Sequence, residues 1–251
     1  MSLFWGIARA DEASVLLQGR FDAASTDAAV NRLAQLAKEG GTSSSAGVAL
    51  LQARFFQADL YLKGDAKIAA HRQNVTDGLS QLSSATGLSL STFDELDRAL
   101  DRMGKSQVPP LFWTTLSYAS TIPSISLFKR LAAAKRFRRS LERMVALDES
   151  YFYGGPLRCL GSFLARAPSL FGGDKALADK NARRAVELAP GFAQAHVDWD
   201  EIRILGKAPK ADWQDDLKRT LALPPVTPIN QPEQKAAQVR AQALLNGAKV
   251  E

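Results

Sequence analysis

Residues 151–174, YFYGGPLRCLGSFLARAPSLFGGD, decide the fold that the sequence predicts. The aromatic residues at its start lead into Gly154 and Gly155, where the chain is expected to break. Pro156 then fits the first position of a helix, because the backbone amide donor that proline lacks is not needed there. The predicted helix has one apolar face, formed by Leu157, Leu160, Gly161 and Leu164.

A second helix is predicted directly after this one, over residues 175–188. The chain turns before it through Ala167 and Pro168 and then through Gly172 and Gly173. Asp174 is placed to cap the new helix. Glycine costs stability inside a helix, so Gly161 indicates that a neighbouring helix packs closely there. The stretch therefore predicts a tightly packed helical hairpin.

The second helix carries small residues at helical spacing and ends at Leu188 and Pro190, which is typical of a tetratricopeptide-type unit. A similar ending precedes it, since residues 138–152 align with residues 179–193. The combination of residues 147–168, the GGD turn and the ending LAPGF resembles the T component of tripartite ATP-independent periplasmic (TRAP) transporters. The likeness is strongest over residues 147–192.

Helical periodicity extends over the whole chain, without a convincing alternating strand pattern. We therefore expect an all-α, tetratricopeptide-like array of antiparallel helix pairs with irregular repeats, forming one domain over residues 1–251. Residues 1–10 are interpreted as a leader remnant or an added cloning segment. Residues 222–232 are proline-rich and predict a linker to a C-terminal capping helix over residues 233–245.

The net charge of +6 and the pI near 9.5 are compatible with an ordinary soluble surface. The predicted helix over residues 125–147 is strongly basic, so an acidic partner is an alternative. No nucleic-acid motif accompanies it. Residues 106–128 carry no charge, but their prolines and hydroxyl residues argue against a membrane span and favour a buried helix over residues 110–121.

The sequence offers no catalytic motif, metal-ligand spacing or cofactor-binding loop. His71 lacks Cys, Asp or Glu neighbours at ligand spacing, and the single cysteine, Cys159, is expected to be a packed thiol. We therefore expect a non-enzymatic protein with no catalytic residue, no metal and no cofactor.

Aromatic residues and one cation are the candidate ligand contacts: Trp113, Tyr118, Tyr151, Tyr153 and Arg158. In one interpretation they converge on a concave site that binds a small apolar or amphipathic molecule with an acidic group. In the other, the rings fill the core and Arg158 pairs with a carboxylate or with carbonyl groups at a helix end.

The family resemblance implies an exported accessory protein of solute uptake that binds a periplasmic solute-binding protein. Family members usually begin with a signal sequence, often ending in a lipidated cysteine, and neither is recognised here. A cytoplasmic location is the alternative. The rival function is a general tetratricopeptide scaffold without a transport role, and assembly into a homo-oligomer is a further option.

Overall fold

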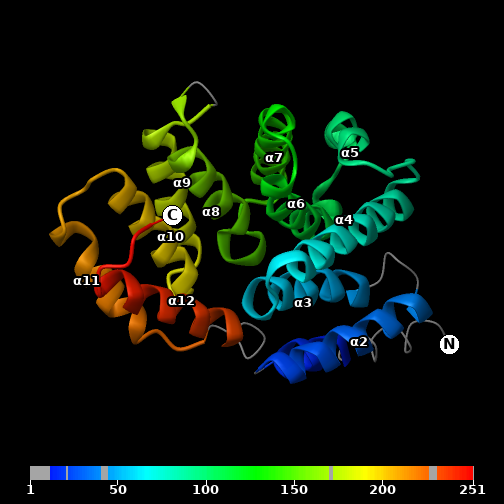
Figure 1. Ribbon diagram of the computed structural model, residues 1–251, viewed down its shortest axis with the longest axis horizontal. Helices are drawn as coiled ribbons and strands as arrows, with labels where there is room; N and C mark the ends of the chain where they lie inside the picture. The colour runs from blue at the N-terminus through cyan, green and yellow to red at the C-terminus, as the bar shows by residue number, and fades with distance from the viewer. Residues whose placement is uncertain (1–11, 21, 41–44, 170–171, 226–230, 251) are drawn as a thin grey trace. The chain divides into compact units, whose positions relative to one another are not determined.

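The computed structural model describes residues 12–20, 22–40, 45–169, 172–225 and 231–250, and every regular element within these ranges is a helix (Figure 1). The all-α prediction is therefore confirmed. The chain divides into two compact units, Met1–Leu147 and Asp148–Glu251, and each is described by itself. The expectation of one continuous repeat domain stays a prediction, and the expected leader remnant lies outside the described residues.

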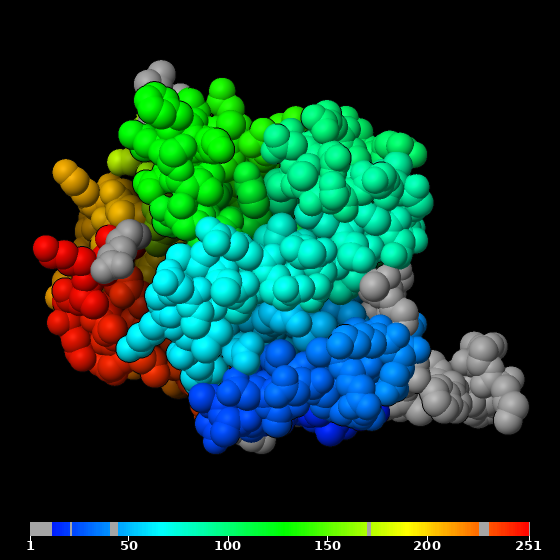
Figure 2. Space-filling view, turned by 45° about the vertical axis from the view of Figure 1, so that its right-hand side comes forward, coloured from blue at the N-terminus to red at the C-terminus, as the bar shows by residue number. Residues whose placement is uncertain are grey.

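The first unit, called unit 1, opens with a helical stretch over residues 12–18. Its longer helices are α2 (Ala23–Gly40), α3 (Ser45–Tyr61), α4 (Gly64–Thr86), α5 (Phe93–Ala99), α6 (Val108–Thr121) and α7 (Leu127–Asp148). Consecutive helices α2, α3 and α4 pack in order, and α6 packs against both α3 and α4. On the face shown in Figure 2, the surface of this unit passes from α2 through α4 to α5.

The centre of unit 1 is the uncharged helix α6, which confirms the predicted buried helix and extends it to Val108. Its small hydroxyl residues let α4 approach closely. A Cβ atom added at Gly78 of α4 would overlap the side chain of Thr114, which is fully buried. Among the described helices, none is long and apolar enough to span a bilayer.

Two ion pairs connect helix α7 with helix α5. Arg136 contacts Asp94 at 3.0 Å, and Arg139 contacts Asp97 at 2.9 Å. The start of α5 is fixed by a capping box, in which Glu95 accepts the amide hydrogen of Thr92 at 2.9 Å while the amide of Glu95 donates to Thr92 Oγ1. Part of the basic charge of α7 therefore holds the unit together.

The second unit, called unit 2, consists of α8 (Tyr151–Arg166), α9 (Lys175–Leu188), α10 (Ala193–Leu205), α11 (Ala211–Leu221) and α12 (Gln231–Leu245). Helices α8, α9 and α10 pack against one another, and α10, α11 and α12 do the same. The second group shares a core of Ala193, Val197, Leu217, Ala237, Ala241 and Leu244. Residues 226–230 of the predicted linker lie outside the described residues.

Helix α8 begins differently from the prediction. Phe152, Tyr153 and Gly154 have positive φ angles of 45°, 58° and 70°, so the right-handed part of the helix starts at Gly155 and not at Pro156. Gly154 suits this place for two reasons, because it tolerates the positive φ and because a Cβ atom there would lie 3.0 Å from Ala185 of α9. Residues 152–154 thus form a left-handed turn, which includes Gly154, the first residue of the predicted break.

The α8–α9 hairpin is as tightly packed as its glycines predict. A Cβ atom at Gly161 would lie 3.0 Å from the carbonyl oxygen of Ala178, and one at Gly173 would overlap the carbonyl of Ala167. Asp174 caps α9 as expected, accepting the amide hydrogen of Leu177 at 2.9 Å. Backbone contact across this hairpin therefore explains why small residues stand at these positions.

Candidate functional site

The candidate ligand contacts fall in both units, and those of unit 1 are Trp113 and Tyr118 on α6. Trp113 is fully buried, with its ring centroid 5.0 Å from Phe112 and 5.6 Å from Phe55. Tyr118 is half-buried and stacks on Phe93 of α5 at a centroid distance of 3.7 Å. Burial raises the pKa of Tyr118 although nearby Arg136 lowers it. Both rings therefore serve to pack α6 within its unit.

The contacts of unit 2 gather around the left-handed turn. Tyr153 stacks on Phe192 at 4.4 Å between ring centroids, and the guanidinium carbon of Arg158 lies 5.0 Å from the same ring centroid. Tyr151 neighbours the turn, with its ring centroid 6.4 Å from that of Phe152. The structure thus brings Tyr153 and Arg158 together at the ring of Phe192, a residue that the sequence reasoning had not included.

Arg158 is only 6% exposed and has a full set of structural partners. Its Nη1 donates to Asp198 of α10 at 2.9 Å, and its Nε donates to the carbonyl oxygen of Tyr153 at 3.2 Å. Its Nη2 donates to the carbonyl oxygen of Phe152 at 3.4 Å. Burial raises the pKa of Asp198 although Arg158 lowers it. These contacts favour the interpretation in which Arg158 stabilises the turn, and ligand contact stays a prediction.

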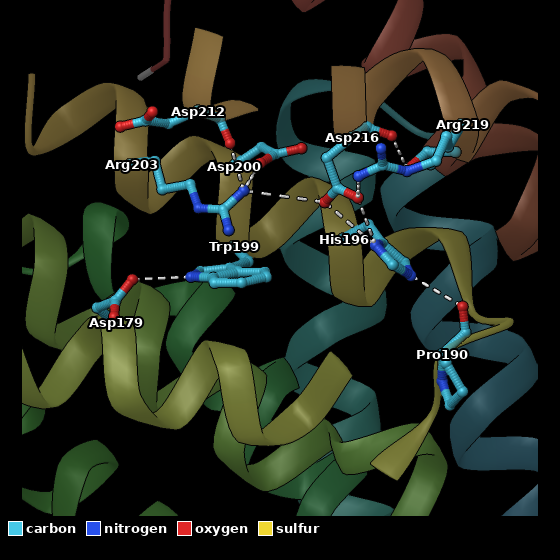
Figure 3. Close-up of polar contacts among 10 residues, drawn as sticks. Asp179, Pro190, His196, Trp199, Asp200, Arg203, Asp212, Asp216 and Arg219 are labelled. Carbon is cyan, nitrogen blue, oxygen red and sulfur yellow. Dashed lines mark hydrogen bonds and ion pairs between the residues drawn. The ribbon is translucent and has the colours of Figure 1, made fainter. Parts of the chain in front are cut away.

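A buried polar network connects α10 with α11 in the same unit (Figure 3). His196 places Nδ1 3.2 Å from Asp216 Oδ2 and Nε2 2.8 Å from the carbonyl oxygen of Pro190. Both partners are acceptors, so only the imidazolium form donates to both. Burial alone lowers the pKa of His196, but these two hydrogen bonds raise it above its ordinary value.

Asp200 is the most deeply buried acid of this network, with no exposed surface. Its Oδ1 accepts a hydrogen bond from Arg203 Nη1 at 2.8 Å, while its Oδ2 has no partner among the described residues. Burial, reinforced by the charge of Asp216, raises the pKa of Asp200 to about 7, and Arg203 only partly opposes this. Asp200 therefore gains and loses its proton near neutral pH.

Arg203 lies over the ring of Trp199, with its guanidinium carbon 3.3 Å from the ring centroid (Figure 3). Trp199 in turn donates from Nε1 to Asp179 of α9 at 2.8 Å. Arg203 and Asp179 both line a cavity of about 180 Å³ in unit 2. The rest of its wall is formed by Ala165, Lys175, Ile202, Leu205, Gly206 and Ala208.

The comparison with protein families identifies the relatives of this chain. The model of the TRAP transporter T-component matches residues 53–250, which is more than half of the 251 residues. The chain belongs to the TRAP transporter T-component family. A comparison with curated proteins found no match.

The resemblance inferred from residues 147–192 is thereby confirmed, and the family match extends far beyond it. The T-component family is an accessory component of a transporter and is not a known enzyme family. Within the described ranges, no group of His, Cys, Asp or Glu side chains is placed to hold a metal ion. Burial raises the pKa of Cys159 to about 12, so its thiol stays protonated and unreactive at neutral pH.

Sequence reasoning in this family member missed the α10 network. One signal was available, because His196, Asp200 and Arg203 follow one another at helical spacing, with Trp199 and Arg203 four residues apart. Such spacing is also typical of an exposed helix face. What buries Asp200 is the packing of α10 against α9 and α11, which spacing within α10 does not reveal.

Proposed function

We propose that the protein is a non-enzymatic accessory component of TRAP-type solute uptake that acts in the periplasm and binds a periplasmic solute-binding protein. The observation that carries this proposal is the T-component family match over residues 53–250. The match extends over residues of both units, so the proposal concerns the whole repeat-bearing part of the chain and not a single hairpin.

The structure supports this proposal through the kind of surface that helical hairpins make. Stacked helix pairs expose extended faces that are suited to binding a folded partner. In unit 2, the α8–α9 hairpin is held by close backbone contact, and α10 packs on both of its helices. A rigid arrangement of this kind can bind another protein without first becoming ordered, which lowers the cost of association.

The small-ligand part of the predicted function has less support at the residues first chosen. Trp113 is fully buried, and Arg158 is occupied by Asp198 and two carbonyl groups. A ligand at either residue would have to displace these contacts. A ligand contacted by Trp113, Tyr118, Tyr151, Tyr153 and Arg158 therefore stays a prediction.

A capture experiment tests the proposed partner. The folded chain is immobilised and exposed, in parallel, to the periplasmic and the cytosolic fractions of the source cells. A basic protein of similar size and pI serves as control, because it reveals capture that depends only on positive charge. We expect mass spectrometry to show a solute-binding protein enriched from the periplasmic fraction over this control.

Raising the salt concentration separates binding through a specific interface from capture by surface charge. Binding through a shaped interface should persist when the salt concentration is raised well above about 0.15 M, whereas capture driven by surface charge weakens. If the chain recovers only cytosolic chaperones or other cytosolic proteins, the transport role is wrong and the general scaffold function takes its place.

A further inference from the structure

Arg203 lines a cavity in unit 2, and one edge of its guanidinium makes no hydrogen bond within the described residues. We propose that this cavity binds a small monocarboxylate with an apolar body, whose carboxylate is held by Arg203. The site lies within unit 2, between α8, α9 and α10, and differs from the aromatic residues considered above. It does not require a protein partner, so it is tested independently of the proposed transport role.

The guanidinium of Arg203 makes all its hydrogen bonds from one nitrogen. Nη1 donates to Asp200 Oδ1 at 2.8 Å and to the carbonyl oxygen of Asp212 at 2.9 Å, and it also lies 4.0 Å from Asp216 Oδ2. Within the described part of the chain, Nε and Nη2 have no hydrogen-bond partner. These two donors form one edge of the planar group, which is the edge that receives a carboxylate in a bidentate pair.

The position of this edge is fixed before any ligand arrives. The guanidinium carbon lies 3.3 Å from the ring centroid of Trp199, while Asp200 and the carbonyl of Asp212 hold Nη1 (Figure 3). The side chain of Arg203 is only 18% exposed. Since its rotamer is already fixed, a ligand does not bear the entropy cost of ordering a long side chain.

The remaining wall matches an apolar body joined to one negative charge. Ile202 and Leu205 supply apolar surface from α10, and Ala165 supplies it from α8. Lys175 adds a second cation, and it has no ion pair or hydrogen bond among the described residues. The one acid of the wall, Asp179, already accepts the hydrogen of Trp199 Nε1. The charge of the wall therefore favours an anion.

Size restricts the ligand further. The cavity of about 180 Å³ corresponds to the liquid volume of about six water molecules. Pockets for drug-sized ligands are larger, at about 300–1,000 Å³. A short branched acid such as isovalerate, with roughly seven non-hydrogen atoms, suits the smaller volume. Its alcohol analogue, isoamyl alcohol, has a similar apolar body but no charge.

The test is a titration of the full chain with isovalerate, followed by two-dimensional nuclear magnetic resonance of the backbone amides. We expect saturable shifts at residues lining the cavity, and much weaker binding of isoamyl alcohol. Arg203→Gln should weaken isovalerate binding by at least about tenfold, the effect of losing hydrogen bonds to a charged group. Lys175→Gln should weaken it less, because Lys175 is exposed.

Matched controls separate the site from general charge effects. Arg184→Gln and Lys218→Gln remove exposed cations of α9 and α11 that do not line the cavity, so affinity should stay unchanged. Ala165→Leu fills the cavity while keeping Arg203 and its partners, and it should abolish binding even if Arg203→Gln proves unstable.

Three results would overturn the proposal. The first is that the wild-type chain shows no saturable shifts with isovalerate. The second is that isoamyl alcohol binds as tightly as the acid, since the charge would then have no role. The third is that Ala165→Leu binds isovalerate as well as the wild type.

Discussion

Helices α6 and α10 hold comparable positions, each packed against several helices of its own unit, but their buried residues differ in kind. Helix α6 carries no charge and buries aromatic rings together with small hydroxyl residues such as Thr114 and Thr115. Helix α10 buries the two carboxylates Asp200 and Glu201 in addition to its apolar residues. Burial of apolar surface depends little on pH, whereas buried carboxylates respond to pH and require their partners. The two units should therefore fail for different reasons.

Glu201 illustrates what the charges of α10 accomplish. It accepts a hydrogen bond from Arg166 of α8 at 2.6 Å and another from Arg240 of α12 at 2.6 Å. One carboxylate thus joins three helices. A buried carboxylate of this kind fixes the positions of the helices more than it raises the free energy of unfolding, because its desolvation offsets much of the attraction. Loss of a single partner is nevertheless strongly destabilising, because it leaves a buried charge unpaired.

The largest expected effect is a loss of stability in unit 1, whose central helix α6 is uncharged. Trp113→Ala removes a fully buried ring that contacts Phe112 and Phe55, and it should destabilise unit 1 by about 4 kcal/mol through lost burial and the cavity left behind. Hydrogen exchange measured by mass spectrometry should show faster exchange in α3, α4 and α6. Unchanged protection of these helices would contradict the comparison.

The second effect breaks a buried pair in unit 2. Arg158→Ala leaves Asp198 without its main cation and frees the carbonyls of the left-handed turn, so we expect a loss of about 3 kcal/mol in denaturant unfolding. Arg158→Leu combined with Asp198→Leu should recover part of it, because no charge is left unpaired.

Arg138→Ala is the control for this experiment. Its pair with Glu142 on α7 is exposed, with both side chains more than 30% accessible, and should matter by less than about 0.5 kcal/mol. If Arg158→Ala is as mild as this control, Arg158 is not structural, and its role as a ligand contact becomes the better interpretation.

The smallest effect is a pH dependence confined to unit 2. Between about pH 4 and pH 7 the folded chain keeps a proton on Asp200, whose pKa is about 7, while the unfolded chain has released it. Stability therefore falls as pH rises, by about 2 kcal/mol between pH 5.5 and pH 8.5. His196, whose pKa is also raised, acts in the same direction, because its favourable charge is lost at high pH.

Asp200→Asn isolates this contribution. The amide cannot ionise, so unfolding measured across the same pH range should show a flatter profile, with the variant gaining on the wild type at high pH. Asp216 does not interfere, because its pKa is lowered and it titrates below this range. A wild-type stability that rises with pH would contradict the assignment of Asp200 as a protonated buried acid.

The sequence predicted those features that depend on neighbouring residues. The all-α class, the buried helix α6 and the cap at Asp174 all follow from periodicity and local hydrogen bonding. The position of Gly161 also predicted close packing of the hairpin. Each of these signals lies within a few residues of the structure that it produces.

The remaining features depend on residues far apart in the chain. Positive φ angles at Phe152 and Tyr153 contradict local preference and need Arg158, Asp198 and the close approach of α9. The cavity likewise combines residues of three helices with the residues that follow α10. No spacing rule within one helix contains this information, and the same holds for the burial of Asp200.

The left-handed turn also bears on how the protein folds. Each non-glycine residue in this conformation costs about 1–2 kcal/mol, so the turn has little tendency to form alone. Arg158 stabilises this turn, and Arg158 is itself paired with Asp198 of α10, which lies 40 residues later in the sequence. The motif at the start of α8 should therefore become ordered late in folding, once α10 has docked.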